Sequence, residues 1–141
     1  MSSLWVAVYG SGVALLESGD VAGRHRFRRL GLKEGLPDIG VNTLLEDGSG
    51  RLWASTDDGL ALIDPVTLAV RTLQQSQGVH VLQHWTNSGT VTGTGELLFG
   101  GQTGLTVVRP AVYKDSTYSA PLVVSDIRVG DKSLPVPRKR Y

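Results

Sequence analysis

The stretch LWASTDDGLALI, residues 52–63, decides the fold, because similar stretches lie before and after it. The earlier one is LWVAVYGSGVALL, residues 4–16, and the later one is LLFGGQTGLTVV, residues 97–108. Each has an apolar run of strand length, a polar or glycine-rich break that ends in one glycine, and a second apolar run. This order is typical of a β-hairpin.

The three hairpins recur at a nearly constant spacing. Their glycines, Gly12, Gly59 and Gly104, are 47 and 45 residues apart. A hairpin in every repeat of this length is typical of the blades of a β-propeller. We therefore predict an all-β chain that holds a β-propeller fragment of about two to three four-stranded blades.

The central repeat contains enough strands for one whole blade. Asp-Gly and Asp-Pro turns separate four apolar runs, at residues 41–46, 51–56, 60–63 and 68–73. We expect the partial propeller to span residues 1–110. Its parts would be a partial blade at 1–34, a full blade at 35–78 and a closing blade at 79–110.

The second strand of the full blade is apolar on both faces. Alternation places Trp53 with Ser55 on one face and Leu52 with Ala54 on the other. A sheet of this kind is covered on both sides, as neighbouring blades would cover it. Trp5 occupies the same repeat position as Trp53, so we expect both tryptophans to pack between blades.

The composition argues against nucleic acid, membrane spans and cysteine chemistry. The 141 residues include 14 Lys and Arg against 13 Asp and Glu, so the formal net charge is only +1. No cysteine is present, which excludes disulfides and cysteine-bound metals. No apolar run approaches the roughly 20 residues of a membrane helix, and we identify no signal peptide. The basic stretch 24–30 is interpreted as an edge strand whose charges block unwanted pairing.

The repeats resemble those of the two-component regulator propeller family. The matching stretches are GLP at 35–37, VNTLLED at 41–47, GRLW at 50–53, DDGL at 57–60 and GELLFGG at 95–101. The stretch APLVVSDIRV, residues 120–129, resembles the start of the Ig-like triple-Tyr domain that follows such propellers. Leu68 departs from the pattern, because the family usually has glycine at that position.

This resemblance implies a function in signalling. Such propellers form the extracytoplasmic sensor part of bacterial hybrid histidine kinases and of some GGDEF-type diguanylate cyclase receptors. The chain would then be a ligand-sensing, signal-transmitting, periplasmic segment of a transmembrane receptor, with no reaction of its own. A small molecule or saccharide would bind across the face of the ring in the intact receptor. Residues 111–141 would be a linker and the first strand of an Ig-like sandwich.

Two other functions stay open. A propeller enzyme, such as a lyase or hydrolase, would need histidines and acidic residues converging from adjacent blades. His25, His80 and His84 do not occupy matching repeat positions, which argues against that arrangement. A protein-interaction scaffold is the second alternative.

The sequence predicts no catalytic, cofactor or metal site. His80 and His84 are four residues apart, but their surroundings read as strand and no third ligand lies near. The acidic turn at 57–59 resembles a calcium loop, yet its counterparts at 10–12 and 102–104 contain no carboxylate. Turn formation explains it better.

The ligand-binding residues are predicted from a break in the repeat. The segment from His84 to Asn87 is irregular compared with the other repeats, and binding residues often lie where loops depart from a regular scaffold. We therefore predict His84, Trp85 and Asn87 as ligand-binding residues. We also expect a homo-oligomer, because an open set of blades leaves unpaired strand edges and uncovered apolar faces.

Overall fold

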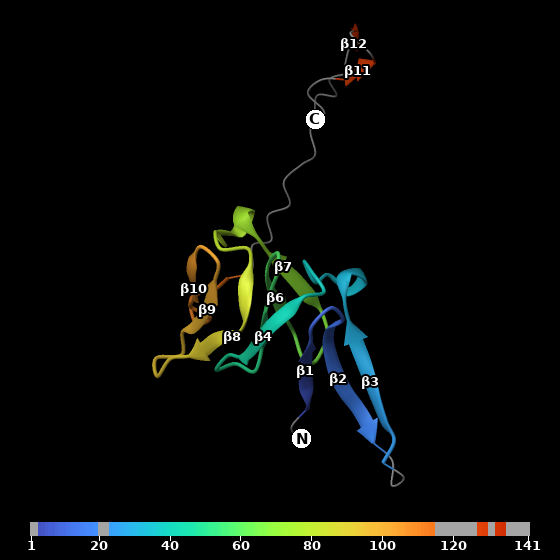
Figure 1. Cartoon of the computed structure of the whole chain (residues 1–141), viewed down its shortest axis with the longest axis vertical. Coiled ribbons are helices and arrows are strands. Elements are labelled where there is room, and N and C mark those ends of the chain that lie inside the picture. The colour runs from blue at the N-terminus through green and yellow to red at the C-terminus, as the bar shows by residue number, and fades with distance from the viewer. Residues whose placement is uncertain (1–2, 20–22, 115–126, 130–131, 135–141) are drawn as a thin grey trace.

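The chain forms antiparallel β-sheets that follow one another along the sequence, and the predicted all-β class is confirmed (Figure 1). The computed structural model describes residues 3–19, 23–114, 127–129 and 132–134. The strands in these ranges are β1 (Trp5–Val8), β2 (Gly12–Gly19), β3 (His25–Leu30), β4 (Val41–Glu46), β5 (Leu52–Thr56), β6 (Gly59–Ile63), β7 (Val70–Leu73), β8 (His84–Val91), β9 (Leu97–Gly101), β10 (Gly104–Val108), β11 (Ile127–Val129) and β12 (Lys132–Leu134).

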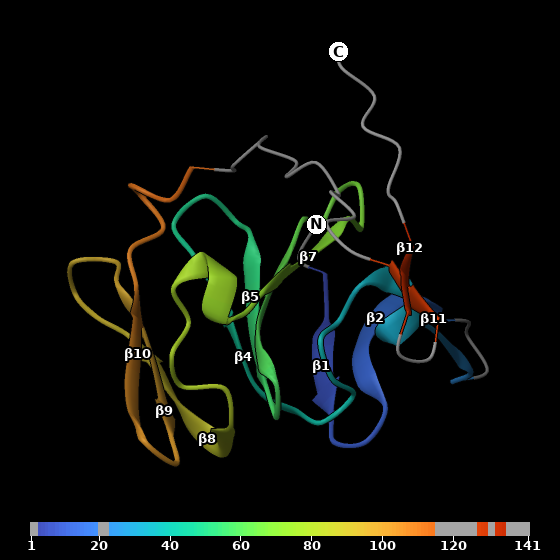
Figure 2. The same cartoon turned by 90° about the horizontal axis from the view of Figure 1, so that it is seen from above.

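Three sheets stand side by side, with the four-stranded one between the others (Figure 2). The first sheet has the strand order β1-β2-β3, the middle sheet β4-β5-β6-β7 and the third sheet β10-β9-β8. Strands that are adjacent in the chain pair antiparallel, so each sheet is a meander. The middle sheet contains the four strands predicted for residues 35–78.

The three repeated hairpins all place their glycine at the start of the second strand. Gly12, Gly59 and Gly104 have φ angles of 84°, 102° and 153°, in the region that favours glycine. At Gly59 the space is also restricted, because an added Cβ would lie 2.5 Å from the carbonyl oxygen of Leu73. A glycine is therefore required there by both the backbone and its neighbour.

Two short 3-10 helices, η1 (Leu32–Glu34) and η2 (Gln75–Gln77), repeat in the links between sheets. A left-handed glycine ends each one, Gly35 with φ 108° and Gly78 with φ 87°. The repeat therefore extends beyond the strands, to the connections between the sheets.

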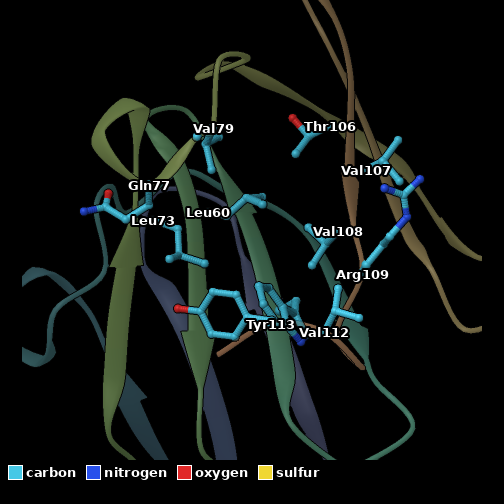
Figure 3. Close-up of a pocket in the computed structure, with 12 residues that line it drawn as sticks. Leu60, Leu73, Gln77, Val79, Thr106, Val107, Val108, Arg109, Val112 and Tyr113 are labelled. Carbon is cyan, nitrogen blue, oxygen red and sulfur yellow. The ribbon is translucent and has the colours of Figure 1, made fainter. Parts of the chain in front are cut away.

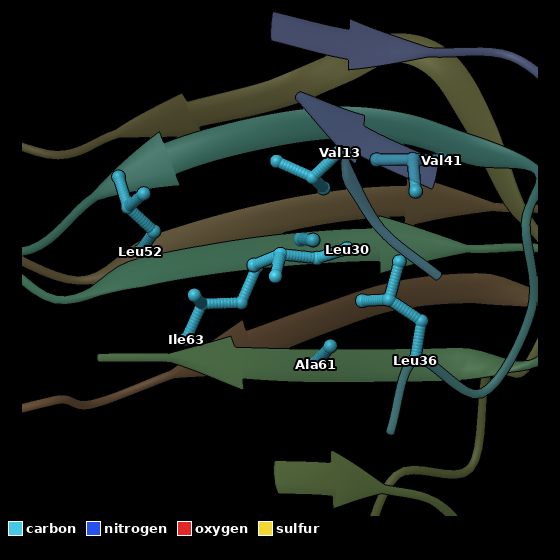
Figure 4. Packing of buried hydrophobic residues seen from close by; sticks show 8 residues of the cluster. Val13, Leu30, Leu36, Val41, Leu52, Ala61 and Ile63 are labelled. Carbon is cyan, nitrogen blue, oxygen red and sulfur yellow. The ribbon is translucent and has the colours of Figure 1, made fainter. Parts of the chain in front are cut away.

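The middle sheet is buried on both faces, as its sequence predicts. We call the face defined by Leu52, Ala54, Ala61 and Ile63 the leucine face; it packs against the first sheet. The buried cluster between these two sheets consists of Val13, Leu30, Leu36, Val41, Leu52, Ala54, Ala61 and Ile63 (Figure 4).

The opposite face packs against the third sheet. We call it the tryptophan face, defined by Trp53, Leu60, Leu62 and Leu73. Its buried cluster consists of Trp53, Leu60, Leu62, Leu73, Val79, Leu97 and Phe99. Trp53 is completely buried, so the prediction that it packs between sheets is confirmed.

Both interfaces join the same two kinds of face. The repeats align Trp5 with Trp53 and Leu97 with Leu52. Trp5 packs against the cluster between the first and middle sheets, so the first sheet uses its tryptophan face there. Leu97 packs in the cluster around Trp53, so the third sheet uses its leucine face. Each sheet thus turns its tryptophan face to the leucine face of the next.

Strand β8 differs from the sequence prediction. The segment from His84 to Asn87 was predicted to be irregular, whereas it forms the first half of β8, which begins at His84. Its pairing with β9 shifts register between His84 and Gly89, and Asn87 has a φ of 56°. This β-bulge interrupts the alternation of side chains, and the strand pattern is therefore hidden in the sequence.

The stretch at 120–129, which is predicted to begin the Ig-like sandwich, lies largely outside the described residues. Residues 127–129 form β11, which pairs antiparallel with β12. The described part of this segment is therefore a two-stranded antiparallel sheet, and the first strand of an Ig-like sandwich stays a prediction.

Candidate functional site

The three predicted ligand-binding residues lie in the first half of β8, and the structure separates them. His84 is buried, with 3% of its surface exposed, whereas Trp85 is 60% exposed and Asn87 is also exposed. Only Trp85 and Asn87 are therefore placed where a ligand from solvent could contact them.

His84 has a structural position. One ring nitrogen, Nδ1, lies 3.3 Å from the carbonyl oxygen of Thr56, and Nε2 lies 3.1 Å from Oγ1 of Thr106. Its ring also packs edge-on against Phe99, with 6.1 Å between ring centroids. Burial lowers the pKa of His84, and backbone hydrogen bonds oppose this only in part. The neutral imidazole thus holds the start of β8 against β5 and β10.

A polar network that the sequence did not single out includes Thr86, the residue that follows Trp85. The side-chain amide of Asn42 donates a 2.7 Å hydrogen bond to Oδ1 of Asp57. The hydroxyl of Thr86, the residue between Trp85 and Asn87, donates a 3.0 Å hydrogen bond to Oδ1 of Asn42. This network connects the middle and third sheets directly next to the exposed part of β8.

Only a weak indication of this hydrogen-bond network is present in the sequence. Asn42 is 5% exposed, and a buried amide needs hydrogen-bond partners. Asp57 was read only as a turn residue. Because these two residues and Thr86 come from three different strands and turns, no local spacing could indicate that they meet.

A second candidate is a cavity of about 280 Å³ between the middle sheet and β10 (Figure 3). Leu60, Leu73 and Val79 line one side, and Val108 lines the other. Tyr113 contributes to the wall and packs edge-on against Trp53, with ring centroids 5.3 Å apart. The cavity is mostly apolar, so it would accept an apolar side chain more readily than a polar ligand.

Arg51 attaches the segment that follows β10 to the middle sheet. Its Nη2 donates a 3.1 Å hydrogen bond to the carbonyl oxygen of Pro110. The guanidinium carbon lies 5.8 Å from the centre of the Trp53 ring and 6.0 Å from that of Tyr113, within reach of cation–π attraction. The chain therefore leaves the third sheet while held against the middle one.

Asp47 stabilises this attachment through hydrogen bonds to Arg51 and Trp53. It is buried and accepts hydrogen bonds from the Trp53 indole at 2.8 Å and from Nε of Arg51 at 2.9 Å. Both the backbone nitrogen and the hydroxyl of Ser49 donate to it as well. Burial alone would raise the pKa of Asp47, but the hydrogen bonds from Ser49, from the Trp53 indole and from the backbone nitrogen of Arg51 outweigh it and lower the pKa to about 2.

The described residues contain no cluster of metal-binding side chains. No group of three or more His, Asp or Glu in those ranges could hold a metal ion. His25 lies on β3 and His80 lies in the link before β8, both exposed and in different parts of the fold. Among the same residues, no helix is long and apolar enough to cross a membrane.

The fold is similar to solved extracellular domains from B. thetaiotaomicron. With the extracellular domain of BT3049, described as a hybrid two component system, the TM-score is 0.72 at 22% identity over 96% of this chain and 19% of that chain. With the extracellular domain of BT4673, described as a one component system, it is 0.65 at 18% identity over 86% of this chain and 17% of that chain.

A sequence relative is a much longer protein. Histidine kinase P4 of Formosa agariphila is 25% identical over 96 residues, which is 68% of this chain and 7% of that protein. No family model matches the chain. The chain thus spans less than a fifth of the length of each of these similar proteins. The structural likeness, at these identities, shows the fold.

Proposed function

We propose that this chain is a run of β-propeller blades from the extracytoplasmic sensor region of a bacterial transmembrane signalling receptor. The observation that carries the proposal is the repeated packing of tryptophan face on leucine face. A unit that stacks on its neighbour in the same direction each time generates a ring or a solenoid rather than a closed two-layer domain. The likeness to extracellular domains of signalling systems supports the assignment to a sensor region.

The sensing step would use the exposed part of β8. Trp85 offers an aromatic surface, and Asn87 is exposed on the same strand. Thr86, which stands between them in the chain, belongs to the network with Asn42 and Asp57. An exposed aromatic side chain on the same strand as an exposed amide suits a small polar ligand such as a saccharide, which stacks and hydrogen-bonds at once.

The transmitting step would use the attachment of the segment after β10. Arg51 and Tyr113 hold this segment on the middle sheet, so a shift between the middle and third sheets would change the direction in which the chain leaves. An Ig-like unit after it would pass that change toward the membrane. The output module would be of the histidine kinase kind, the kind to which the sequence relative belongs, or of the diguanylate cyclase kind.

The rival functions have less support. A propeller lyase or hydrolase would need histidine and acidic side chains that meet, and the one buried histidine, among the described residues, is occupied by hydrogen bonds within the core. A scaffold for other proteins would bind through exposed strand edges without a small ligand. Ligand titration separates the scaffold from the sensor.

The test is tryptophan fluorescence of the chain titrated with neutral and uronic oligosaccharides and with free amino acids. Trp85 is far more exposed than the buried Trp53, so a ligand at β8 would change its emission in a saturable way. We expect the response to be lost in Trp85→Ala and to weaken in Asn87→Ala. A saturable response that Trp85→Ala leaves unchanged would exclude this site. No response to any of these probes would favour the scaffold.

A further inference from the structure

The start of β8 has a histidine at a place that is apolar in the middle sheet. His84 pairs with Gly101, the last residue of β9, and Val41 pairs with Thr56, the last residue of β5. Gly101 and Thr56 are 45 residues apart, which is the spacing between the second and third repeats. His84 therefore occupies the place of Val41. Both side chains are buried, with 3% and 2% of their surface exposed.

The hydrogen bonds of His84 suit a neutral ring. The carbonyl oxygen of Thr56 can only accept a hydrogen bond, so Nδ1 carries the ring hydrogen. Nε2 then accepts a hydrogen bond from the hydroxyl of Thr106. Protonation adds a hydrogen to Nε2, so the Thr106 hydroxyl would have to change from donor to acceptor. Protonation would also place a full positive charge in the core, which is costly without a partner of opposite charge.

The strands that pack around His84 offer no buried carboxylate to balance this charge. Strands β5, β6, β9 and β10 contain no ionisable residue, and β4 contains only Glu46, which is exposed. In the adjoining turn, Asp57 and Asp58 are each bonded to an amide side chain, and His80 in the preceding link is exposed. Burial of the ring therefore has the largest influence, and it lowers the pKa of His84 below the ordinary 6.5.

The segment that follows His84 is held by few contacts. Strand β8 pairs with β9 at His84 and next at Gly89, because the register shifts between these two residues. The three residues directly after His84 are exposed. The ring of His84 thus fastens the first half of β8 to the middle sheet, together with the hydrogen bond from Thr86 to Asn42.

We propose that protonation of His84 in mildly acidic solution releases the start of β8 from the middle sheet, while the other strands keep their structure. The released ring is hydrated, so the open form binds a proton more readily than the closed form. The stability of the closed form is therefore fully present above pH 6.5, the ordinary pKa, and decreases as the pH falls below it. Local opening of this kind needs no global unfolding.

The release would act on the predicted ligand-binding residues. Trp85 and Asn87 follow His84 in the same half of β8, so opening of this segment would move both. Ligand affinity should therefore fall in acid, a consequence that rests on the sensor function proposed above. The release itself needs no ligand, so a failed ligand titration would leave it unaffected.

Amide hydrogen exchange of the full chain, followed by NMR from about pH 7.5 to pH 5, tests the release with two equivalent backbone amides. The amide of Gln102 donates a 3.1 Å hydrogen bond to the carbonyl oxygen of Gln83, just before β8. The amide of Asp57 donates one of 3.2 Å to the carbonyl oxygen of Gly40, just before β4. Only the first of these carbonyls precedes a histidine, so the Asp57 amide is an internal control.

The two amides should respond differently to acid. The protection factor of the Gln102 amide should fall by up to about tenfold for each pH unit below 6.5, until the closed form is itself protonated. The protection factor of the Asp57 amide should stay constant. His84→Val should remove the pH dependence at Gln102, because valine is the residue at this place in the middle sheet. His80→Gln is the matched control, since it replaces an exposed histidine of the same link and should leave the pH profile unchanged.

The titration of the His84 ring in the wild type, followed by its Cε1 resonance, keeps the test valid if His84→Val is unstable. The pKa of the ring should lie below 6.5. Equal pH dependence of the Gln102 and Asp57 amides would overturn the proposal, as would a loss of protection that persists in His84→Val. A ring that titrates with a pKa at or above 6.5 would overturn it as well.

Discussion

The middle sheet and the two outer sheets are built from the same repeat, yet they differ in how much of it they bury. Strands β5 and β6 are buried at every position, whereas β1 and β10 have no buried position. The difference comes from neighbours and not from composition, because Leu60 and Leu105 occupy equivalent positions with opposite exposure. A repeat of this size therefore becomes a stable core only when it is flanked on both sides.

The largest expected effect tests this difference directly with two equivalent tryptophans. Trp53→Ala should cost about 3–5 kcal/mol of unfolding free energy, because the side chain is completely buried and a cavity would remain. Trp5→Ala should cost less than half of that, since Trp5 is only partly buried at the same repeat position. Urea unfolding of both variants measures this. An equal loss of unfolding free energy in the two variants would show that the middle sheet is no more important for stability than the first sheet.

A medium effect concerns Asp47, whose repeat counterpart in the third sheet is the uncharged Thr92. Because the pKa of Asp47 is lowered from 3.8 to about 2 in the fold, its charged form is favoured by about 2 kcal/mol. This stability is fully present above pH 4 and is lost as the pH falls toward 2. Asp47→Asn should be less stable at neutral pH.

The measurement for Asp47 is the unfolding free energy at several pH values. The wild type should lose its advantage over Asp47→Asn between pH 4 and pH 2. A Thr92→Val variant serves as the control, since it removes no charge and should leave this part of the pH profile unchanged. A gap between wild type and Asp47→Asn that stays constant down to pH 2 would contradict the charge argument.

The smallest effect concerns Leu68, which precedes β7 and has a φ of 61°. Leucine is strained in this region, whereas glycine is not. Both Leu68→Ala and Leu68→Gly remove the packing of the leucine side chain. The difference between their unfolding free energies therefore reports the backbone preference at this position. We expect the glycine variant to be more stable than the alanine variant by about 1 kcal/mol, which reverses the usual order.

The neighbouring Ala69 gives the control for this comparison. It is not among the described residues with positive φ, so Ala69→Gly should destabilise by about 0.5–1 kcal/mol. Thermal unfolding of the three variants is sufficient. If Leu68→Ala is more stable than Leu68→Gly, the residue at position 68 does not adopt the left-handed conformation. The positive φ of Leu68 also explains why the family that this chain resembles usually has glycine at this position.

The hairpins and the two apolar faces of β5 were predictable because they depend on residues that are close in sequence. Alternation assigns Leu52 and Trp53 to opposite faces, and a polar turn between two apolar runs predicts each hairpin. The bulge in β8 was not predictable, because it interrupts the alternation on which the argument depends. For the same reason, the placement of His84 in the core was missed.

The sequence by itself determined an all-β chain, the repeat, and which side chains of the middle sheet face its two neighbours. Only the tertiary structure decided that Asn42 bonds to Asp57 and Thr86, that Arg51 holds the segment after β10, and which faces of the outer sheets stay uncovered. The physical reason is the distance along the chain over which each kind of interaction acts. Strand and turn preferences act between near neighbours, whereas these contacts depend on how whole sheets stack, which is set by the combined packing of side chains far apart in the chain.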